Sequence, residues 1–205
     1  GGYCNTTIVG CNTRKYHGLF VMPIEEFGGV NHILLSSVDE TLIQHDKEFN
    51  LGIRSYGKIY EPRGHKYIVD FQFDKECTIE YRVGGMIFRK SMIFVKGKEQ
   101  LLIKYTLVQA HSETYLRLKP FMAFREVHTL TQQNPEASAN YGIVDNGASF
   151  KMYEGFPTLH LQLNKENDYF HNPDWYKDVV YSDEQRRGFE YKEDLFVPGV
   201  FEMPI

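Results

Sequence analysis

Apolar residues recur at every second position along much of this chain, and this period of two constrains the fold more than any other feature. In Tyr67–Phe73 each odd-numbered residue is apolar. The alternation returns in Leu101–Leu107 and Leu159–Leu163, while Leu116 and Leu118 alternate with basic neighbours. Successive side chains of a strand point to opposite faces of a sheet, so this pattern predicts half-buried β-strands.

Turn-forming residues separate these stretches. Gly84-Gly85 lies between Cys77–Val83 and Met86–Val95, a two-residue spacing typical of a β-hairpin. Further breaks are Lys96-Gly97-Lys98, Asn146-Gly147 and the polar stretch Thr131–Asn140, which we expect to be a surface loop. About a dozen short strands joined by tight turns indicate an all-β fold, a large antiparallel β-sandwich. No repeat or linker divides the chain, so we expect one domain over residues 1–205.

One segment departs from the period of two. Asn172-Pro173 has the pattern of a helix cap followed by proline at the first helical position, and Gly188 after two arginines is typical of a helix end. The residues that would share one face of this helix are Trp175, Tyr176, Val179 and Val180. We therefore expect a short helix near residues 173–187.

Charge and hydropathy exclude two classes of partner. The formal net charge is −4 and no long basic tract is present, which argues against nucleic acid, because phosphate binding needs clustered Lys and Arg. No apolar run approaches the roughly 20 residues that span a bilayer, and nothing resembles a signal peptide. We expect no membrane partner and a cytoplasmic location.

Cysteine and histidine spacing gives no metal or cofactor motif. Three cysteines, Cys4, Cys11 and Cys77, are an odd and sparse set that fits a reducing compartment. The eight histidines show no ligand spacing, and glycine-rich phosphate loops and a nucleophile elbow are missing from the sequence. We expect no metal and no cofactor.

The opening stretch NTRKYHGLF, residues 12–20, concentrates cations and aromatic rings. In a strand, Arg14 and Tyr16 would share one face and His17 the other, which argues against a single catalytic cluster. Arg14 and Tyr16 could hold a polyol by hydrogen bonds and ring stacking. The structural alternative is that Arg14 pairs with an acid and Tyr16 packs at the rim of a sheet.

Two further groups near the C-terminal end are candidates. Glu190, Glu193 and Asp194 form an acidic group, and sugar hydrolysis uses two carboxylates about 5–9 Å apart. Sequence neighbours seldom face each other in that way, so the alternative is that these acids pair with Arg14 or another arginine. Trp175 lies among tyrosines and phenylalanines that suit either a sugar platform or the core.

Taken in order, these signals resemble one family, the N-terminal domain of bacterial and archaeal type glycogen debranching enzymes. The opening GGY…NTRKYHGLFV is similar to the first signature of that domain, and Ile33–Leu42 (ILLSSVDETL) resembles its next strand pair. The closing Arg186–Ile205 resembles its acidic stretch followed by a Pro-Gly-x-Phe strand. The resemblance spans essentially the whole chain.

The resemblance implies a supersandwich, a galactose-mutarotase-like β-sandwich, that precedes a helical barrel. It implies that the amylo-α-1,6-glucosidase acids lie on that α/α toroid, so we expect this chain to be a fragment without catalytic residues of its own. The implied partners are the C-terminal catalytic domain of the same polypeptide and α-glucan, meaning glycogen or branched malto-oligosaccharides. In this context Arg14 and Tyr16 face the barrel or the glucan, and Glu190, Glu193 and Asp194 are candidate partners of Arg14.

Two other functions stay open at this point. The chain could be an autonomous carbohydrate-binding module, which would need Trp175 and its neighbours exposed to solvent. It could instead be a stand-alone sugar hydrolase or epimerase, for which His17 with Glu190 or Glu193 is the only pairing that the sequence offers.

Overall fold

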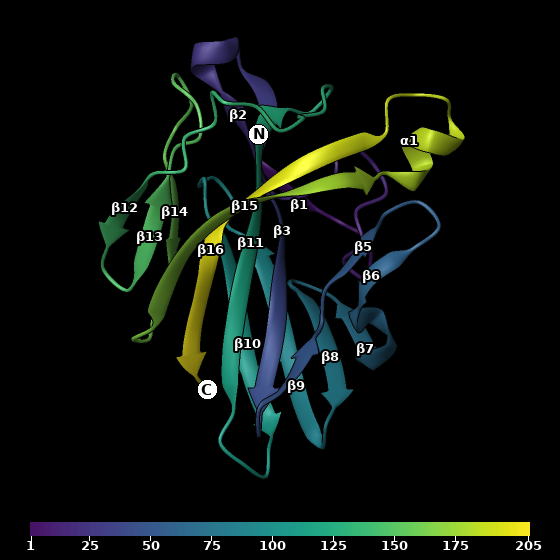
Figure 1. Cartoon of the computed structure of the whole chain (residues 1–205), viewed down its shortest axis with the longest axis vertical. Helices are drawn as coiled ribbons and strands as arrows, with labels where there is room; N and C mark the ends of the chain where they lie inside the picture. Colours follow the sequence, from purple (N-terminus) through teal and green to yellow (C-terminus); the bar gives the residue numbers. More distant parts are fainter.

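The computed structural model describes residues 1–205 and consists almost entirely of antiparallel strands (Figure 1). The largest sheet has seven strands. Six follow the order β1-β2-β3-β11-β16-β15, and β4 pairs with β3 beside them. Their bounds are β1 Tyr3–Asn5, β2 Gly18–Ile24, β3 Val30–Gln44, β4 Lys47–Asn50, β11 Tyr115–Glu126, β15 Asp168–Val180 and β16 Lys192–Pro204.

Two smaller sheets pack against one face of this large sheet. One has the order β10-β9-β8-β7, and the other has the order β12-β13-β14. The bounds are β7 Ile68–Phe73, β8 Cys77–Val83, β9 Met86–Phe94, β10 Leu101–Gln109, β12 Tyr141–Val144, β13 Gly147–Phe150 and β14 Leu159–Gln162. A two-stranded pair is made of β5 Ile53–Ser55 and β6 Tyr60–Arg63. The all-β sandwich expected from the period of two is confirmed.

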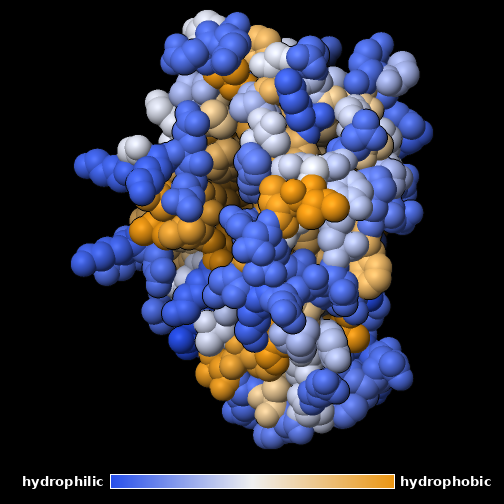
Figure 2. All heavy atoms as spheres, turned by 90° about the vertical axis from the view of Figure 1, so that its left-hand side faces the viewer, coloured by the Kyte–Doolittle hydropathy of each residue, from blue (hydrophilic) through white to orange (hydrophobic).

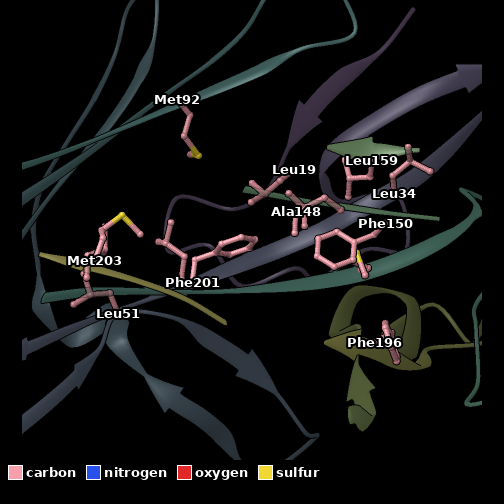
Figure 3. Close-up of a cluster of buried hydrophobic side chains, with 14 of the residues drawn as sticks. Leu19, Leu34, Leu51, Met92, Ala148, Phe150, Leu159, Phe196, Phe201 and Met203 are labelled. Carbon is pink, nitrogen blue, oxygen red and sulfur yellow. The ribbon is translucent and has the colours of Figure 1, made fainter. Parts of the chain in front are cut away.

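The main core lies between the large sheet and the two smaller ones (Figure 3). Leu34 comes from β3 and Phe201 from β16, whereas Met92 comes from β9 and Phe150 from β13. All four side chains are almost completely buried. Burial of a large apolar side chain contributes about 1.5–3 kcal/mol, so this shared core holds three sheets together.

A second, smaller core covers the opposite face of the large sheet. Along β11, Met122 and Phe124 point into the main core, while Phe121 and Ala123 point into the second. The large sheet is therefore buried on both faces here, which explains why β11 reads as a continuous apolar run instead of alternating. The Arg54 guanidinium from β5 lies over the Phe121 ring, 3.7 Å from its centroid, and covers this face.

The hairpins and the long loop expected from the sequence are confirmed. Gly84 and Gly85 connect β8 to β9, and both have positive φ, which glycine adopts without strain. Lys96–Lys98 lies between β9 and β10, and the turn at Asn146 joins β12 to β13. Thr131–Asn140 contains no helix or strand.

The helix expected near residues 173–187 is present only in part. Residues 168–180 form β15, and the only α-helix, α1, spans Ser182–Arg186; two 3₁₀ turns cover Glu25–Phe27 and Gly64–Tyr67. The prediction of a helical face from Trp175 to Val180 is wrong. Pro173 lies where the pairing of β15 with β16 skips between His171 and Asp174, and β15 is an edge strand. Proline is tolerated at such an irregular edge position because no ladder hydrogen bond is lost there.

The periphery of the sandwich differs from one side to the other in the elements and side chains that it exposes. In Figure 1, β12–β14 lie to the left and α1 projects at the upper right, beyond the ends of β15 and β16. Figure 2 shows the left-hand side, where separate hydrophobic patches lie between hydrophilic side chains. Ile143 of β12 and Phe170 of β15 are 88% and 53% exposed. No helix is long and apolar enough to cross a membrane.

Candidate functional site

The opening segment 12–17 forms a turn, not the strand that the sequence suggested. β2 begins only at Gly18, and the amide of His17 donates a 3.1 Å hydrogen bond to the carbonyl of Arg14. Backbone groups here bond to side chains instead of to a neighbouring strand. The amide of Thr13 donates to His17 Nδ1 at 3.2 Å, and the amide of Lys15 donates to Glu184 Oε1 at 3.4 Å. Such local side-chain partners compete with sheet formation.

Arg14 forms an ion pair with Glu184 of α1. Its Nε lies 2.7 Å from Glu184 Oε1, and the side chains are 33% and 1% exposed. The three acids predicted as partners, Glu190, Glu193 and Asp194, do not contact Arg14, so that part of the prediction is wrong. The sequence has five acids within residues 183–194, and only the fold places Glu184 beside the opening segment.

Burial raises the pKa of Glu184, but the hydrogen bonds from Arg14 and from the Lys15 amide outweigh it, and the net effect lowers the pKa. The second carboxylate oxygen, Oε2, is buried without a partner. Glu184 is therefore ionised and depends on Arg14 for its compensation.

Glu193 lies at the centre of a buried network beneath this turn. Arg125, at the end of β11, donates from Nε and from one terminal nitrogen to the Glu193 carboxylate, and the Tyr181 hydroxyl donates to it as well. The amide of Thr131 adds a 3.3 Å bond. Arg125 also donates to the carbonyl of Lys15 at 2.9 Å, which ties the opening segment to β11 and β16.

Tyr181 remains protonated within this network. Burial raises the pKa of its hydroxyl, and the neighbouring Glu193 carboxylate raises it further. Glu193 has no exposed surface, and each of its oxygens is engaged by the chain itself. A carboxylate held in this way is suited to fixing strands and loops, not to exchanging protons with a substrate.

Asp194 has a similar role on the other side of β16. Its two oxygens accept hydrogen bonds from the amides of Gln133 at 2.8 Å and Asp178 at 2.9 Å. The amide of Asp194 donates to the carbonyl of Thr131. Asp194 thus anchors the long loop to β16 and holds the irregularity in β15 at Asp178, where φ is +57° and the pairing register shifts.

Two other candidates, Glu190 and Trp175, lie apart from this cluster. Glu190 is exposed and has no ion pair or hydrogen bond within the chain. Trp175 is half-buried against the main core, with its ring edge on Phe196 at a centroid distance of 5.3 Å. Tyr16 and Tyr176 pack against the second core, so Trp175 lies on the opposite face of the sheet from Tyr16.

His17 is held as a neutral acceptor. Its Nδ1 receives the Thr13 amide, and burial, followed by the positive charge of Arg14, lowers its pKa. The pairing of His17 with Glu193 that a hydrolase or epimerase would need is not formed, because Glu193 is bonded to Arg125 and Tyr181.

Above the buried network the chain presents aromatic and cationic side chains together. We call this the Tyr16–Phe189 surface, made of Lys15, Tyr16, His128, Arg187 and Phe189. The Tyr16 and His128 rings meet edge to face at 5.4 Å, and the Tyr16 hydroxyl lies 3.2 Å from His128 Nδ1. Lys15 Nζ donates to the His128 carbonyl at 2.9 Å and lies 5.7 Å from the centroids of both the Tyr16 and Phe189 rings.

Phe189 is more exposed than Tyr16 on this surface. It is 51% exposed, and the Arg187 guanidinium lies 5.0 Å from its centroid. Rings that stay outside the core with cations over their faces fit a partner that brings aromatic, hydroxyl or carboxylate groups.

Reasoning from the sequence missed four residues that build this site, Arg125, His128, Tyr181 and Glu184. Only Arg125 carried a local signal, because a charged residue follows directly on the buried run Phe121–Phe124. The His, Cys, Asp and Glu side chains form no group of three that could hold a metal ion.

Comparison with known proteins gives one match. Residues 1–205, the whole chain, match the family described as glycogen debranching enzyme N terminal. No curated protein and no solved structure matches the chain. The family match confirms the resemblance seen in the opening and closing motifs.

Proposed function

Because the chain belongs to the family of glycogen debranching enzyme N-terminal domains, we propose that it is a non-catalytic domain that packs on a catalytic domain of the same polypeptide. The contact runs through the Tyr16–Phe189 surface. The observation that carries the proposal is the way the opening turn is built. Ion pairs to the buried carboxylates of Glu184 and Glu193 hold this segment in place. The side chains of Lys15 and Phe189 lie next to each other beside it and are not part of the core.

Rigidity supports a docking role. A surface that is already ordered loses little conformational entropy on binding, and the turn 12–17 is tied to β11, α1 and β16 by side-chain bonds. An exposed Phe ring and a half-buried Tyr ring beside Arg and Lys have the composition of interface centres, where aromatic residues and Arg are enriched.

In this account the catalytic residues belong to the partner domain. Glu193 and Asp194 accept hydrogen bonds from the chain's own donors, and Glu190 stands alone at the surface. The two carboxylates that share a cavity, Asp39 and Glu40, are each held in a buried ion pair, with Arg54 and Lys90. This supports placing the glucosidase acids on the following domain. We propose a cytoplasmic setting and a role in glycogen catabolism on the same basis.

α-Glucan is a further proposed ligand of the assembled enzyme. Tyr16 and Phe189 offer ring faces for the C–H surface of glucose units, while Lys15 and Arg187 offer donors for hydroxyl groups. If the docked catalytic domain leaves part of this surface open, a glucan branch can bind along the junction.

The test uses the 205-residue chain and the catalytic portion of the same polypeptide, produced separately. The proposal predicts that the two copurify at low salt and that adding the 205-residue chain raises the debranching rate or the thermal stability of the catalytic portion. Elution of both parts as independent species, with no mutual effect on melting temperature or activity, would contradict it. A glucose-release assay on the 205-residue chain alone must stay at background.

A further inference from the structure

The segment between β1 and β2 covers two neighbouring cavities like a roof. These cavities lie at the point where β2 stops pairing with β3. β2 pairs with β3 only as far as Phe20 and Leu35, and β3 then continues without that neighbour. The larger cavity has a volume of about 30 Å³ and the smaller about 10 Å³. Both are lined by Gly10 from the roof and by Ser36 and Ser37 from β3.

The roof is a compact loop in which residues 6–10 bond only to other roof residues, while Asn12 at its end donates to the carbonyl and the hydroxyl of Ser36 on β3 at 3.2 and 3.3 Å. Thr6 Oγ1 donates to Asn12 Oδ1 at 2.7 Å, Thr7 Oγ1 donates to the carbonyl of Cys11 at 2.8 Å, and the amide of Gly10 donates to the carbonyl of Thr7. No hydrogen bond joins residues 6–10 to the sheets below. Residues 6–10 can therefore lift between Asn5 and Asn12 without the loss of a hydrogen bond to the sheets, although the bond from Thr6 to Asn12 must break.

The floor of the larger cavity carries a buried ion pair. Lys90 Nζ lies 2.6 Å from Glu40 Oε1, and the Tyr105 hydroxyl donates to the same oxygen at 2.8 Å. Both charged side chains are less than 9% exposed. Only one Glu40 oxygen is engaged, so the other oxygen and two further Lys90 N–H groups are free to bond to a guest in the cavity.

The smaller cavity adds a second ion pair. Arg54 binds Asp39 in a bidentate manner at 2.8 and 2.5 Å. Its Nε and the Ser37 hydroxyl are both buried without a partner, and both residues line this cavity. Buried polar atoms of this kind carry a cost of about 1–3 kcal/mol that a hydrogen-bonding guest removes.

The chemistry of the lining selects a neutral guest. Each of the two ion pairs is neutral overall, so a charged molecule gains no net attraction. The lining includes donors from Lys90 and Arg54, acceptors from Glu40 and Asp39, and apolar side chains such as Leu19 and Met92. A molecule that carries both hydroxyl and C–H groups can bond to these donors and acceptors and also contact the apolar walls.

We propose that the space beneath residues 6–10 is a binding site for a small neutral polyhydroxylated molecule, with the loop as its movable cover. With the cover closed, the space holds one or two water molecules. Glycerol and glucose need the loop to lift, and they then replace water on Glu40, Lys90 and Ser37. This site is separate from the Tyr16–Phe189 surface and does not depend on the proposed docking.

The test follows backbone amide NMR signals of the 205-residue chain during titration with glycerol and with glucose. The proposal predicts saturable shifts in residues 6–10 and 36–40. The Val9→Trp variant fills the cavity from the roof and is expected to weaken binding at least about tenfold. Its matched control is Ile8→Trp on the same loop, because Ile8 is 55% exposed and does not line either cavity. The control is expected to bind within about twofold of the unchanged chain.

Ser37→Val covers the case in which Val9→Trp fails to fold. It removes a hydroxyl that has no partner and adds methyl groups to both cavities, so the fold is expected to persist while binding is lost. The proposal is overturned if neither polyol causes saturable shifts up to about 100 mM, well above a millimolar Kd. It is also overturned if the shifts map elsewhere, or if folded Val9→Trp or Ser37→Val binds as tightly as Ile8→Trp.

Discussion

Arg14 Nε donates a 2.7 Å hydrogen bond to Glu184 Oε1 and so joins the opening turn to α1 across 170 positions of the chain. Glu184 is buried and has one oxygen without any partner. Arg14, itself one-third exposed, forms the ion pair that balances most of the charge of this carboxylate, with smaller contributions from the Lys15 amide and Arg187. The Tyr16–Phe189 surface depends on this contact for its shape.

We predict that Arg14→Ala lowers the thermal unfolding midpoint, because it leaves the buried Glu184 carboxylate without its ion-pair partner. Adding Glu184→Gln to Arg14→Ala is expected to restore part of the loss, since the uncompensated charge is then removed. The coupling between the two positions is read from the double-mutant cycle in urea unfolding. Additive losses in that cycle would show that the ion pair does not hold the turn.

We predict a larger effect for Arg125→Met. Arg125 and Glu193 are 3% and 0% exposed, and removing one partner of such a pair costs about 3–5 kcal/mol. The matched control is Arg89→Met, whose pair with Glu80 is exposed and is worth at most about 1 kcal/mol. Urea unfolding followed by fluorescence measures both changes. Equal losses for the two variants would contradict the central role given to the Glu193 network.

A dependence on pH follows from His17. Burial and then the charge of Arg14 lower its pKa below the value of about 6.5 in the unfolded chain. As the pH falls below about 6.5, the unfolded chain binds a proton that the folded chain does not, so folding stability declines until the folded pKa is reached. His17→Asn keeps an acceptor for the Thr13 amide and is expected to flatten this part of the profile. Parallel profiles for the two proteins would mean that another group is responsible.

The fold could be predicted from the sequence where local chemistry decides it. Gly84-Gly85 specifies a hairpin in any context, because both residues need positive φ. Asn172-Pro173 was misleading for the opposite reason. The same dipeptide fits the start of a helix and an irregularity in an edge strand, and only the pairing of β15 with β16 decides between them.

The chain segments that form the candidate site could be predicted from the sequence, but the contacts between their residues could not. The opening turn and the acidic stretch near Glu193 do meet in space, joined through Arg125, which donates to Lys15 and to Glu193. The partner of Arg14 could not be chosen from sequence, because Glu184, Glu190 and Glu193 have the same charge and similar reach. Trp175 was assigned to a helical stripe and lies instead on the core face of a strand.

The proposed docking surface gives a fourth prediction, at Phe189. This ring is 51% exposed and makes cation–π contacts with Lys15 and Arg187, so Phe189→Ala is expected to leave the isolated chain folded. The matched control is Phe170→Ala, because Phe170 is 53% exposed and lies near the start of β15, at the opposite end of that strand from α1.

The most direct measurement is therefore the Kd between the 205-residue chain and the catalytic portion of the same polypeptide, determined by calorimetry for the unchanged chain and both variants. The account predicts that Phe189→Ala weakens association about tenfold or more, while Phe170→Ala stays within about twofold. If Phe189→Ala binds as tightly as the unchanged chain, or if Phe170→Ala is the variant that loses binding, the Tyr16–Phe189 surface is not where the two domains meet.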